Sequence, residues 1–288
     1  MFEGFEQRRV ATGGTEINLR LGGRGPALLL LHGYPQTHVM WHRIAPRLAE
    51  RFTVVCADLR GYGDSGRPES GPDHAAYSKR AMAQDMAEVM TALGFERFSV
   101  VGHDRGARVT HRLLLDHGAR VEKAAVLDIA PTLDMYECTD RAFAEAYYHW
   151  FFLIQPFDLP ERMIGADPDY YLEKKIGKWS KVGGCFDAEA LAEYKRCFRA
   201  PGTIHATCED YRAAAGIDLE HDRADRDRKI AVPLLVLWGK LGVIERCYDV
   251  LALWSARAER VSGRALPCGH FLAEEAPEET LEALLAFL

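Results

Sequence analysis

The chain has 288 residues, of which 48% are hydrophobic and 27% are charged, and its formal net charge is −6. At about 100–200 residues per domain this length allows one large domain or two small ones. The balance of residue types is that of a globular protein with a sizeable core, and it excludes intrinsic disorder and collagen-like repeats. The negative charge, without any lysine- or arginine-rich block, argues against nucleic acid as a partner.

Other features of composition point to an enzyme of the cytoplasm. No apolar run approaches the roughly 20 residues that span a bilayer, so no membrane partner is expected. The first six residues lack the basic and apolar segments of a signal peptide. The seven cysteines include no Cys-x-x-Cys pair, which suits neither a disulfide framework nor a zinc ribbon. His38 and His42 have the spacing of a metal-binding pair, but no acidic third ligand is evident, so no metal is expected.

Strand and helix patterns alternate over the first 130 residues. Residues 6–12 and 16–21 read as a hairpin. Continuous apolar runs predict strands buried on both faces, at residues 27–31, 53–57, 98–101 and 124–128. A helix is expected between Ser78, which can cap its start, and Gly94, which can end it in a left-handed conformation. A second helix is expected over residues 105–117.

The pattern changes between residues 131 and 227, where aromatic and charged residues dominate and helical stretches such as 141–154 and 188–198 follow one another. Alternating elements then return, with strands at 234–238 and 261–266, a helix at 247–256 and a final helix that opens near Pro277. This order predicts an α/β fold with a mainly parallel sheet covered by helices on both faces. Residues 1–131 and 228–288 would form the core domain, and residues 132–227 a helical cap over the active site.

One segment carries the main chemical signal. Residues 99–108 read Ser-Val-Val-Gly-His-Asp-Arg-Gly-Ala-Arg, an apolar strand followed by a tight turn and a helix. Gly102 and Gly106 leave room for a strained turn that holds Asp104 above the edge of the sheet. The alternative is that Asp104 only caps the helix. No Gly-x-Ser-x-Gly occurs in the chain, so a serine esterase would lack its nucleophile.

Further loops follow the predicted strands. Residues 31–35 (Leu-His-Gly-Tyr-Pro) lie where the backbone donors of an oxyanion hole are expected, and Pro-Cys-Gly-His-Phe at 267–271 places His270 after the last strand. Nucleophile, then acid, then histidine is the chain order of the α/β-hydrolase triad. On these motifs the sequence resembles the α/β-hydrolase superfamily over essentially its full length, and the resemblance implies that His270 is catalytic.

The acid of the triad has two candidates. Many members of the superfamily carry it after the strand that corresponds to residues 234–238, but no carboxylate follows there until Glu245. One strand earlier, Asp128 ends a buried strand just before the insertion. A subset of the superfamily uses that earlier strand, which favours Asp128 and leaves Glu245 as the alternative.

An aspartate nucleophile restricts the reaction. Its attack on an ester would give an unfavourable anhydride, whereas attack on a saturated carbon can expel a halide or open an epoxide. Water activated by His270 would then hydrolyse the alkyl ester on Asp104. The backbone N–H groups of Tyr34 and Arg105 are expected to form the oxyanion hole for this step, each worth about 3–4 kcal/mol when preorganised.

Two arginines follow the nucleophile. Arg105 and Arg108 are three residues apart and lie on neighbouring parts of one helix face. Two cations in the first turn oppose the helix dipole, which costs roughly 0.3–1 kcal/mol each. They are interpreted as a clamp for a small anionic substrate, a carboxylate held beside Asp104. The alternative is a pair of solvated arginines that contact surface acids.

A closer resemblance rests on three motifs: Gly-His-Asp-Arg-Gly-Ala-Arg at 102–108, Leu-Asp-Ile-Ala-Pro at 127–131 and Gly-His-Phe at 269–271. Together they resemble the fluoroacetate (haloacetate) dehalogenases. In that family a His-Trp pair and a cap tyrosine hold the departing halide, and the matching positions here, each a potential hydrogen-bond donor, are His149, Trp150 and Tyr211. The resemblance also implies a homodimer.

Some features leave alternatives open. The aromatic stretch 147–152 also fits simple packing of the cap on the core. Tyr34 stands where the family usually has phenylalanine, and residues 240–244 form a loop of unassigned type. The sequence thus predicts hydrolysis of haloacetates to glycolate and halide without a cofactor. An epoxide hydrolase, which uses the same nucleophile with two cap tyrosines, is the alternative, and a non-catalytic ligand-binding member of the superfamily is a third reading.

Overall fold

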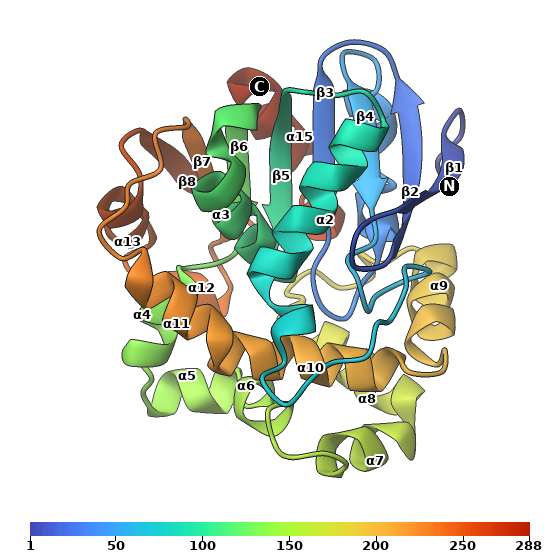
Figure 1. Cartoon of the computed structure of the whole chain (residues 1–288), viewed down its shortest axis with the longest axis vertical. Helices are drawn as coiled ribbons and strands as arrows, with labels where there is room; N and C mark the ends of the chain where they lie inside the picture. Colours follow the sequence, from blue (N-terminus) through green and yellow to red (C-terminus); the bar gives the residue numbers. More distant parts are fainter.

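Eight strands form one central sheet in the computed structural model, which describes residues 1–288 (Figure 1). Their order across the sheet is β1-β2-β4-β3-β5-β6-β7-β8. The strands are β1 (Glu6–Ala11), β2 (Glu16–Gly23), β3 (Ala27–Leu31), β4 (Thr53–Ala57), β5 (Phe98–His103), β6 (Val121–Leu127), β7 (Leu234–Gly239) and β8 (Val261–Leu266). β1 and β2 form the expected antiparallel hairpin, β2 pairs antiparallel with β4, and all neighbours from β4 to β8 are parallel.

The apolar runs lie where the sheet is covered on both faces. Every residue of β3, β5 and β7 is buried, as expected for parallel strands between two helical layers. In Figure 1, α2 and α3 lie in front of the sheet and α15 lies behind it. The helices of these layers and of the strand connections are α1 (Ala45–Leu48), α2 (Lys79–Ala92), α3 (Arg105–His117), α12 (Val243–Cys247), α13 (Val250–Arg257), α14 (Leu272–Glu275) and α15 (Pro277–Phe287), with 3₁₀ turns at His38–Trp41, Ala75–Tyr77 and Gly118–Arg120. The predicted α/β architecture is therefore confirmed.

The chain between β6 and β7 contains helices only, as the sequence indicates. They are α4 (Thr132–Glu137), α5 (Arg141–Ala146), α6 (His149–Phe152), α7 (Leu159–Gly165), α8 (Pro168–Trp179), α9 (Ala188–Phe198), α10 (Thr203–Ala215) and α11 (Ile217–Ala224). This insertion lies across the carboxyl ends of the parallel strands, at the bottom of Figure 1. No helix in the molecule combines the length and the apolar character needed to cross a membrane.

Charged side chains fasten the insertion to the sheet layer. Arg112 on α3 contacts Asp222 of α11 at 3.0 Å and Asp225 at 2.5 Å. Arg257 of α13 contacts Asp134 of α4 at 2.9 Å. Because removal of one partner from such a shielded pair leaves an uncompensated charge, these contacts resist displacement of the insertion. The insertion is thereby held over the residues that follow β5, β6 and β8.

The helix α2 begins and ends as predicted. The Ser78 hydroxyl accepts a hydrogen bond from the N–H of Ala81 at 3.2 Å, and Gly94 has a φ of +86° just after the helix. The helical stretch predicted at 141–154 is divided into α5 and α6, because the chain leaves the helical conformation at Tyr147, whose φ and ψ are −112° and 36°. The helix predicted at 247–256 corresponds to α13, which begins at Val250, and the short helix α12 precedes it as a separate element.

Close backbone packing holds the turn between β5 and α3, and it explains the two glycines there. An ideal Cβ on Gly106 would lie 2.5 Å from the carbonyl oxygens of Leu31 and His32, and one on Gly102 would overlap the carbonyl of Gly106. Main-chain atoms cannot move aside at low cost. The start of α3 is therefore packed closely against the end of β3.

Because of this packing, alanine should affect stability differently at Gly106 and at Gly118, the glycines near the two ends of α3. Replacement of Gly106 with alanine should lower the free energy of unfolding by about 1–3 kcal/mol through overpacking. Gly118, just after the other end of α3, has no atom within 4 Å of an added Cβ and a φ of −56°. Its replacement with alanine should leave stability unchanged or raise it by up to about 1 kcal/mol. Urea unfolding followed by tryptophan fluorescence measures both, and equal effects would contradict the packing account.

Candidate active site

Residues from three strand ends meet at the carboxyl edge of the sheet, where α/β proteins bind ligands. Asp104 follows β5, Asp128 follows β6 and His270 lies in the loop after β8. His270 Nδ1 lies 2.6 Å from Asp128 Oδ2, and its Nε2 lies 3.9 Å from Asp104 Oδ2. The structure thus brings together the nucleophile, acid and base candidates that the sequence analysis selected.

The backbone of Asp104 is strained. Its φ of 48° and ψ of −112° lie outside the regions that residues with a side chain prefer, at a cost of about 1–3 kcal/mol. Its carboxylate makes no capping hydrogen bond to α3, so the alternative of a simple helix cap is wrong. Instead the N–H of Tyr34 donates to Asp104 Oδ1 at 2.8 Å. The N–H of Arg105 has no protein acceptor, and that of Tyr34 is bound only to the nucleophile itself, so both N–H groups can serve the ester formed on Asp104.

Asp128, and not Glu245, contacts the histidine. Asp128 Oδ1 accepts the N–H of Gly239 at 2.9 Å, which leaves Oδ2 for His270. Glu245 is bound by the indole N–H of Trp238 instead. The choice of Asp128 over Glu245 agrees with this geometry, because Glu245 is exposed on the short helix α12 and does not contact His270.

The contacts of His270 set its tautomer and its basicity. The carboxylate of Asp128 accepts a hydrogen bond from Nδ1–H, so the lone pair of the neutral ring is on Nε2, which is buried and has no hydrogen-bond partner. Burial opposes the charged imidazolium, but Asp128 outweighs it and raises the pKa of His270 above its ordinary value. The neighbouring His103 donates to the His270 carbonyl at 2.7 Å, and burial lowers its pKa to about 3.

Asp104 is ionised in this environment. Burial acts against its charge, yet His270, His103, Arg108 and Arg105 together hold the pKa of its carboxyl below the usual value. Only Oδ1 is engaged, by Tyr34. Its Oδ2 is therefore a free carboxylate oxygen, able to attack a carbon atom placed against it.

The two arginines differ in their partners, which the sequence analysis did not anticipate. Arg105 is fully buried and donates to both carboxylate oxygens of Asp210, at 2.8 and 2.6 Å. Lys79 and the hydroxyl of Tyr62 also bind Asp210. Burial opposes the charge of Arg105, but Asp210 outweighs it and holds the pKa of Arg105 well above its usual value. Asp210 could have been suspected only from its place beside Tyr211.

Arg108 has no acidic partner in contact. Its guanidinium donates to neutral acceptors, the Ala130 carbonyl at 3.2 Å, the Thr132 hydroxyl at 2.9 Å and the Met135 sulfur at 3.3 Å. Burial lowers the pKa of Arg108. One buried N–H group of each arginine, Nε of Arg108 and Nη1 of Arg105, has no acceptor at all. These two groups are therefore available to a bound anion.

The three aromatic candidates of the insertion lie against this centre. The guanidinium of Arg105 lies 4.1 Å from the Tyr211 ring centroid, and that of Arg108 lies 4.7 Å from the Trp150 ring. The ring of Tyr34 is stacked on His149 at 6.2 Å and meets Tyr211 edge-on at 5.3 Å. The hydroxyl of Tyr211 and Nδ1 of His149 are buried without partners. The three aromatic candidates thus lie beside Arg105, Arg108 and Tyr34.

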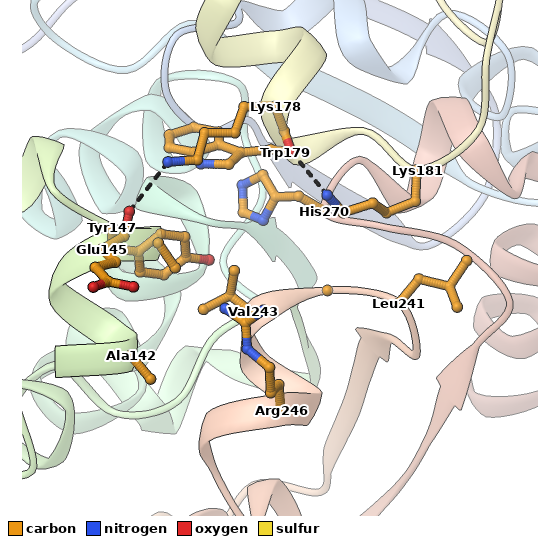
Figure 2. A pocket seen from close by; sticks show the side chains of 12 residues that line it. Ala142, Glu145, Tyr147, Lys178, Trp179, Lys181, Leu241, Val243, Arg246 and His270 are labelled. Carbon is orange, nitrogen blue, oxygen red and sulfur yellow. Dashed lines mark hydrogen bonds between the residues drawn. The ribbon is translucent and has the colours of Figure 1, made fainter. Parts of the chain in front are cut away.

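A cavity of about 490 Å³ opens next to this site (Figure 2). His270, Trp179 and Tyr147 form part of its lining, together with residues of α5, α8 and the segment from Leu241 to Arg246. The Trp179 ring meets His270 at 5.2 Å and His149 at 4.6 Å. Trp179 belongs to no motif and was not predicted from the sequence, although it lines the cavity and its ring contacts both His270 and His149. No group of three or more His, Cys, Asp or Glu side chains is arranged to hold a metal ion.

Comparison with known proteins agrees with this geometry. A fluoroacetate dehalogenase from Burkholderia sp is 50% identical over 289 aligned residues, covering 100% of this chain and 95% of that protein. A soluble epoxide hydrolase from Corynebacterium sp. (strain C12) is 33% identical, and the alignment covers 95% of this chain and 94% of that protein. A crystal structure is known for ALR0039 from Nostoc sp PCC 7120, which is provisionally assigned as an alpha/beta hydrolase. Its sequence is 66% identical, the TM-score is 0.99, and the match covers 100% of this chain and 99% of that chain. A family model for the alpha/beta hydrolase fold matches residues 26–277. The chain belongs to the alpha/beta hydrolase family.

Proposed function

We propose that the protein hydrolyses haloacetates to glycolate and halide through a covalent ester on Asp104. The observation that carries this proposal is that a buried carboxylate nucleophile and a buried guanidinium without an acidic partner share one small site. The identity of 50% to a fluoroacetate dehalogenase supports the same reaction class. The soluble epoxide hydrolase is more distant, at 33%.

The substrate carboxylate binds the two arginines in this proposal. Its oxygens can accept from the free Nε group of Arg108 and the free Nη1 group of Arg105. Asp210 neutralises most of the charge of Arg105, so Arg108 supplies the larger part of the attraction. Charge-assisted hydrogen bonds of this kind are short and directional, and they hold the adjacent methylene carbon near the nucleophile.

The first step is a displacement at this carbon. Asp104 Oδ2 attacks the carbon, a carbon–oxygen bond forms, and the carbon–halogen bond breaks with its electron pair leaving on the halide. His149, Trp150 and Tyr211 are proposed to donate hydrogen bonds to that halide. Burial holds the pKa of His149 well below its ordinary value, so its ring is neutral and donates a single N–H. Donors aimed at developing charge lower the barrier selectively.

The second step returns the enzyme to its starting state. His270 Nε2 accepts a proton from water, and the resulting hydroxide attacks the carbonyl carbon of the Asp104 ester. The former Oδ1 carries the negative charge of the tetrahedral intermediate, next to the N–H groups of Tyr34 and Arg105. Collapse of the intermediate breaks the bond between the carbonyl carbon and the glycolate oxygen, and the leaving alkoxide takes the proton from the imidazolium of His270. Asp104 releases the other proton of the attacking water to solvent as its carboxylate is regenerated. The imidazolium of His270 forms beside Asp128, which stabilises it.

The buried tyrosines keep epoxide opening as the second candidate. The Tyr211 hydroxyl is buried without a partner and could protonate an epoxide oxygen. A neutral epoxide, however, offers no counter-charge to Arg108. An assay of chloroacetate, fluoroacetate and a neutral epoxide side by side separates the two activities.

A stalled intermediate provides the direct test of the mechanism. Replacement of His270 with alanine should allow alkylation but stop hydrolysis, because the base acts only in the second step. Intact-mass spectrometry after exposure to chloroacetate should show one carboxymethyl group per chain, and peptide mapping should locate it on Asp104. A stalled variant without an adduct, or with an adduct on another residue, would reject Asp104 as the nucleophile.

The two arginines should respond differently to replacement. Arg108→Leu should lower kcat/KM for chloroacetate by about 10–100-fold, since a charge-assisted hydrogen bond contributes about 1.5–3 kcal/mol. Arg105→Leu should lower activity and also destabilise the fold by about 3–5 kcal/mol, because it leaves Asp210 short of its main partner in the interior. Steady-state kinetics and thermal melting of both variants measure this contrast. Wild-type chloroacetate kinetics in Arg108→Leu would disprove the proposed carboxylate site.

A further inference from the structure

A buried glutamate near His270 has no part in the mechanism above. Glu275 lies at the end of α14 and forms no ion pair. Its carboxylate instead accepts four main-chain N–H groups: Oε1 from Phe271 at 2.8 Å, and Oε2 from Gly269 at 2.8 Å, Lys181 at 2.8 Å and Val182 at 3.2 Å. One side chain therefore joins the loop that carries His270 to the segment of the insertion that follows α8.

The main chain of the His270 loop is bound on every side. The N–H of His270 donates to the Trp179 carbonyl at 3.2 Å, and its carbonyl accepts from His103 at 2.7 Å. The N–H groups of the residues before and after it are bound by Glu275. An ideal Cβ on Gly269 would lie 2.6 Å from the Trp179 carbonyl oxygen and 2.9 Å from Glu275 Oε2. Only glycine fits this close approach.

The charge of Glu275 also acts on His270. The ionisable groups around the imidazole lie on different parts of the chain, and they are Asp104, His103, Asp128, His149 and Glu275. Burial opposes the imidazolium, while Asp128, Asp104 and Glu275 together raise the pKa of His270. Removal of one of these negative charges makes His270 a weaker base.

We propose that Glu275 is a positioning residue for ester hydrolysis, one that fixes the His270 loop against the insertion and favours proton uptake by the imidazole. The inference rests on the proposed function, and it separates the two chemical steps. His270 takes no part in the alkylation of Asp104. Glu275 should therefore matter for hydrolysis of the ester and not for its formation.

The preceding residue offers a matched control. Glu274 is also buried, but its carboxylate binds Tyr194 and Gln36 and does not contact the His270 loop. Burial raises the pKa of Glu274 to about 8, so glutamine resembles the protonated form that it has at neutral pH. Glu274→Gln and Glu275→Gln thus alter adjacent buried carboxyl groups that differ in their contact with the catalytic loop.

Rapid-quench mass spectrometry with bromoacetate resolves the two steps. For Glu275→Gln, alkylation should remain within about two-fold of wild type and hydrolysis should slow by about 10-fold or more, so that the carboxymethyl enzyme accumulates. Glutamine keeps one acceptor oxygen, but its NH₂ group faces main-chain N–H groups and cannot accept hydrogen bonds from them. The His270 loop is therefore held less firmly. The hydrolysis rate rises as pH increases through the pKa of His270, and this rise should move to lower pH in the variant. Glu274→Gln should match wild type in all three measurements.

A second variant distinguishes the effect of the negative charge of Glu275 from the effect of its side-chain length. Glu275→Asp keeps the negative charge but is shorter by one methylene, so it should slow hydrolysis with a smaller shift of the pH profile. If the glutamine variant does not fold, the same separation of the two steps is measured in the aspartate variant. Equal losses in both steps, or no loss in either, would overturn the inference. A wild-type enzyme that forms no adduct would instead overturn the proposed function.

Discussion

A buried guanidinium without an acidic partner in contact is the constraint on which the rest of the site depends. Removal of a charge from water costs several kcal/mol unless opposite charge or hydrogen bonds replace the solvent. Arg108 has only neutral acceptors and the face of Trp150, whereas Arg105, three residues earlier and equally deep, is paired with Asp210. In the proposed function this difference places the substrate carboxylate beside Arg108, and therefore beside the strained turn that presents Asp104.

The same charges account for the order of the chemistry in the proposed cycle. While Asp104 is ionised, its charge offsets that of Arg108 through space. Once the ester forms, Asp104 is neutral, and the carboxylate of the bound group remains as the counter-charge of Arg108. His270 then accepts a proton on Nε2 while its Nδ1 lies 2.6 Å from Asp128 Oδ2, so the positive charge of the imidazolium faces a carboxylate and no isolated charge forms in the interior at either step.

Much of this arrangement could be predicted because it depends on short stretches of sequence. The apolar strands and the turns that follow them place Asp104, Asp128 and His270 at the carboxyl edge of the sheet, and this placement does not depend on how the insertion covers that edge. The pairing of Arg105 could not be predicted, because Asp210 is 105 residues away and reaches it only when the insertion packs on the core. The break at Tyr147 escaped for a similar reason, since helical periodicity continues through it while tertiary packing turns the chain. Glu275 could not be predicted either, because it binds main-chain N–H groups of two separate segments and these contacts leave no side-chain motif in the sequence.

In the covalent mechanism the new oxygen of glycolate comes from Asp104 and not directly from water. A single turnover in ¹⁸O-water, with enzyme in excess over bromoacetate, distinguishes these two sources of the oxygen. Attack of water on the carbonyl carbon of the ester leaves the label in the carboxylate of Asp104, so the first glycolate released should be unlabelled and the peptide that contains Asp104 should carry ¹⁸O. Labelled glycolate in the first turnover, with an unlabelled Asp104 peptide, would show that water displaces the halide directly and would contradict the covalent mechanism.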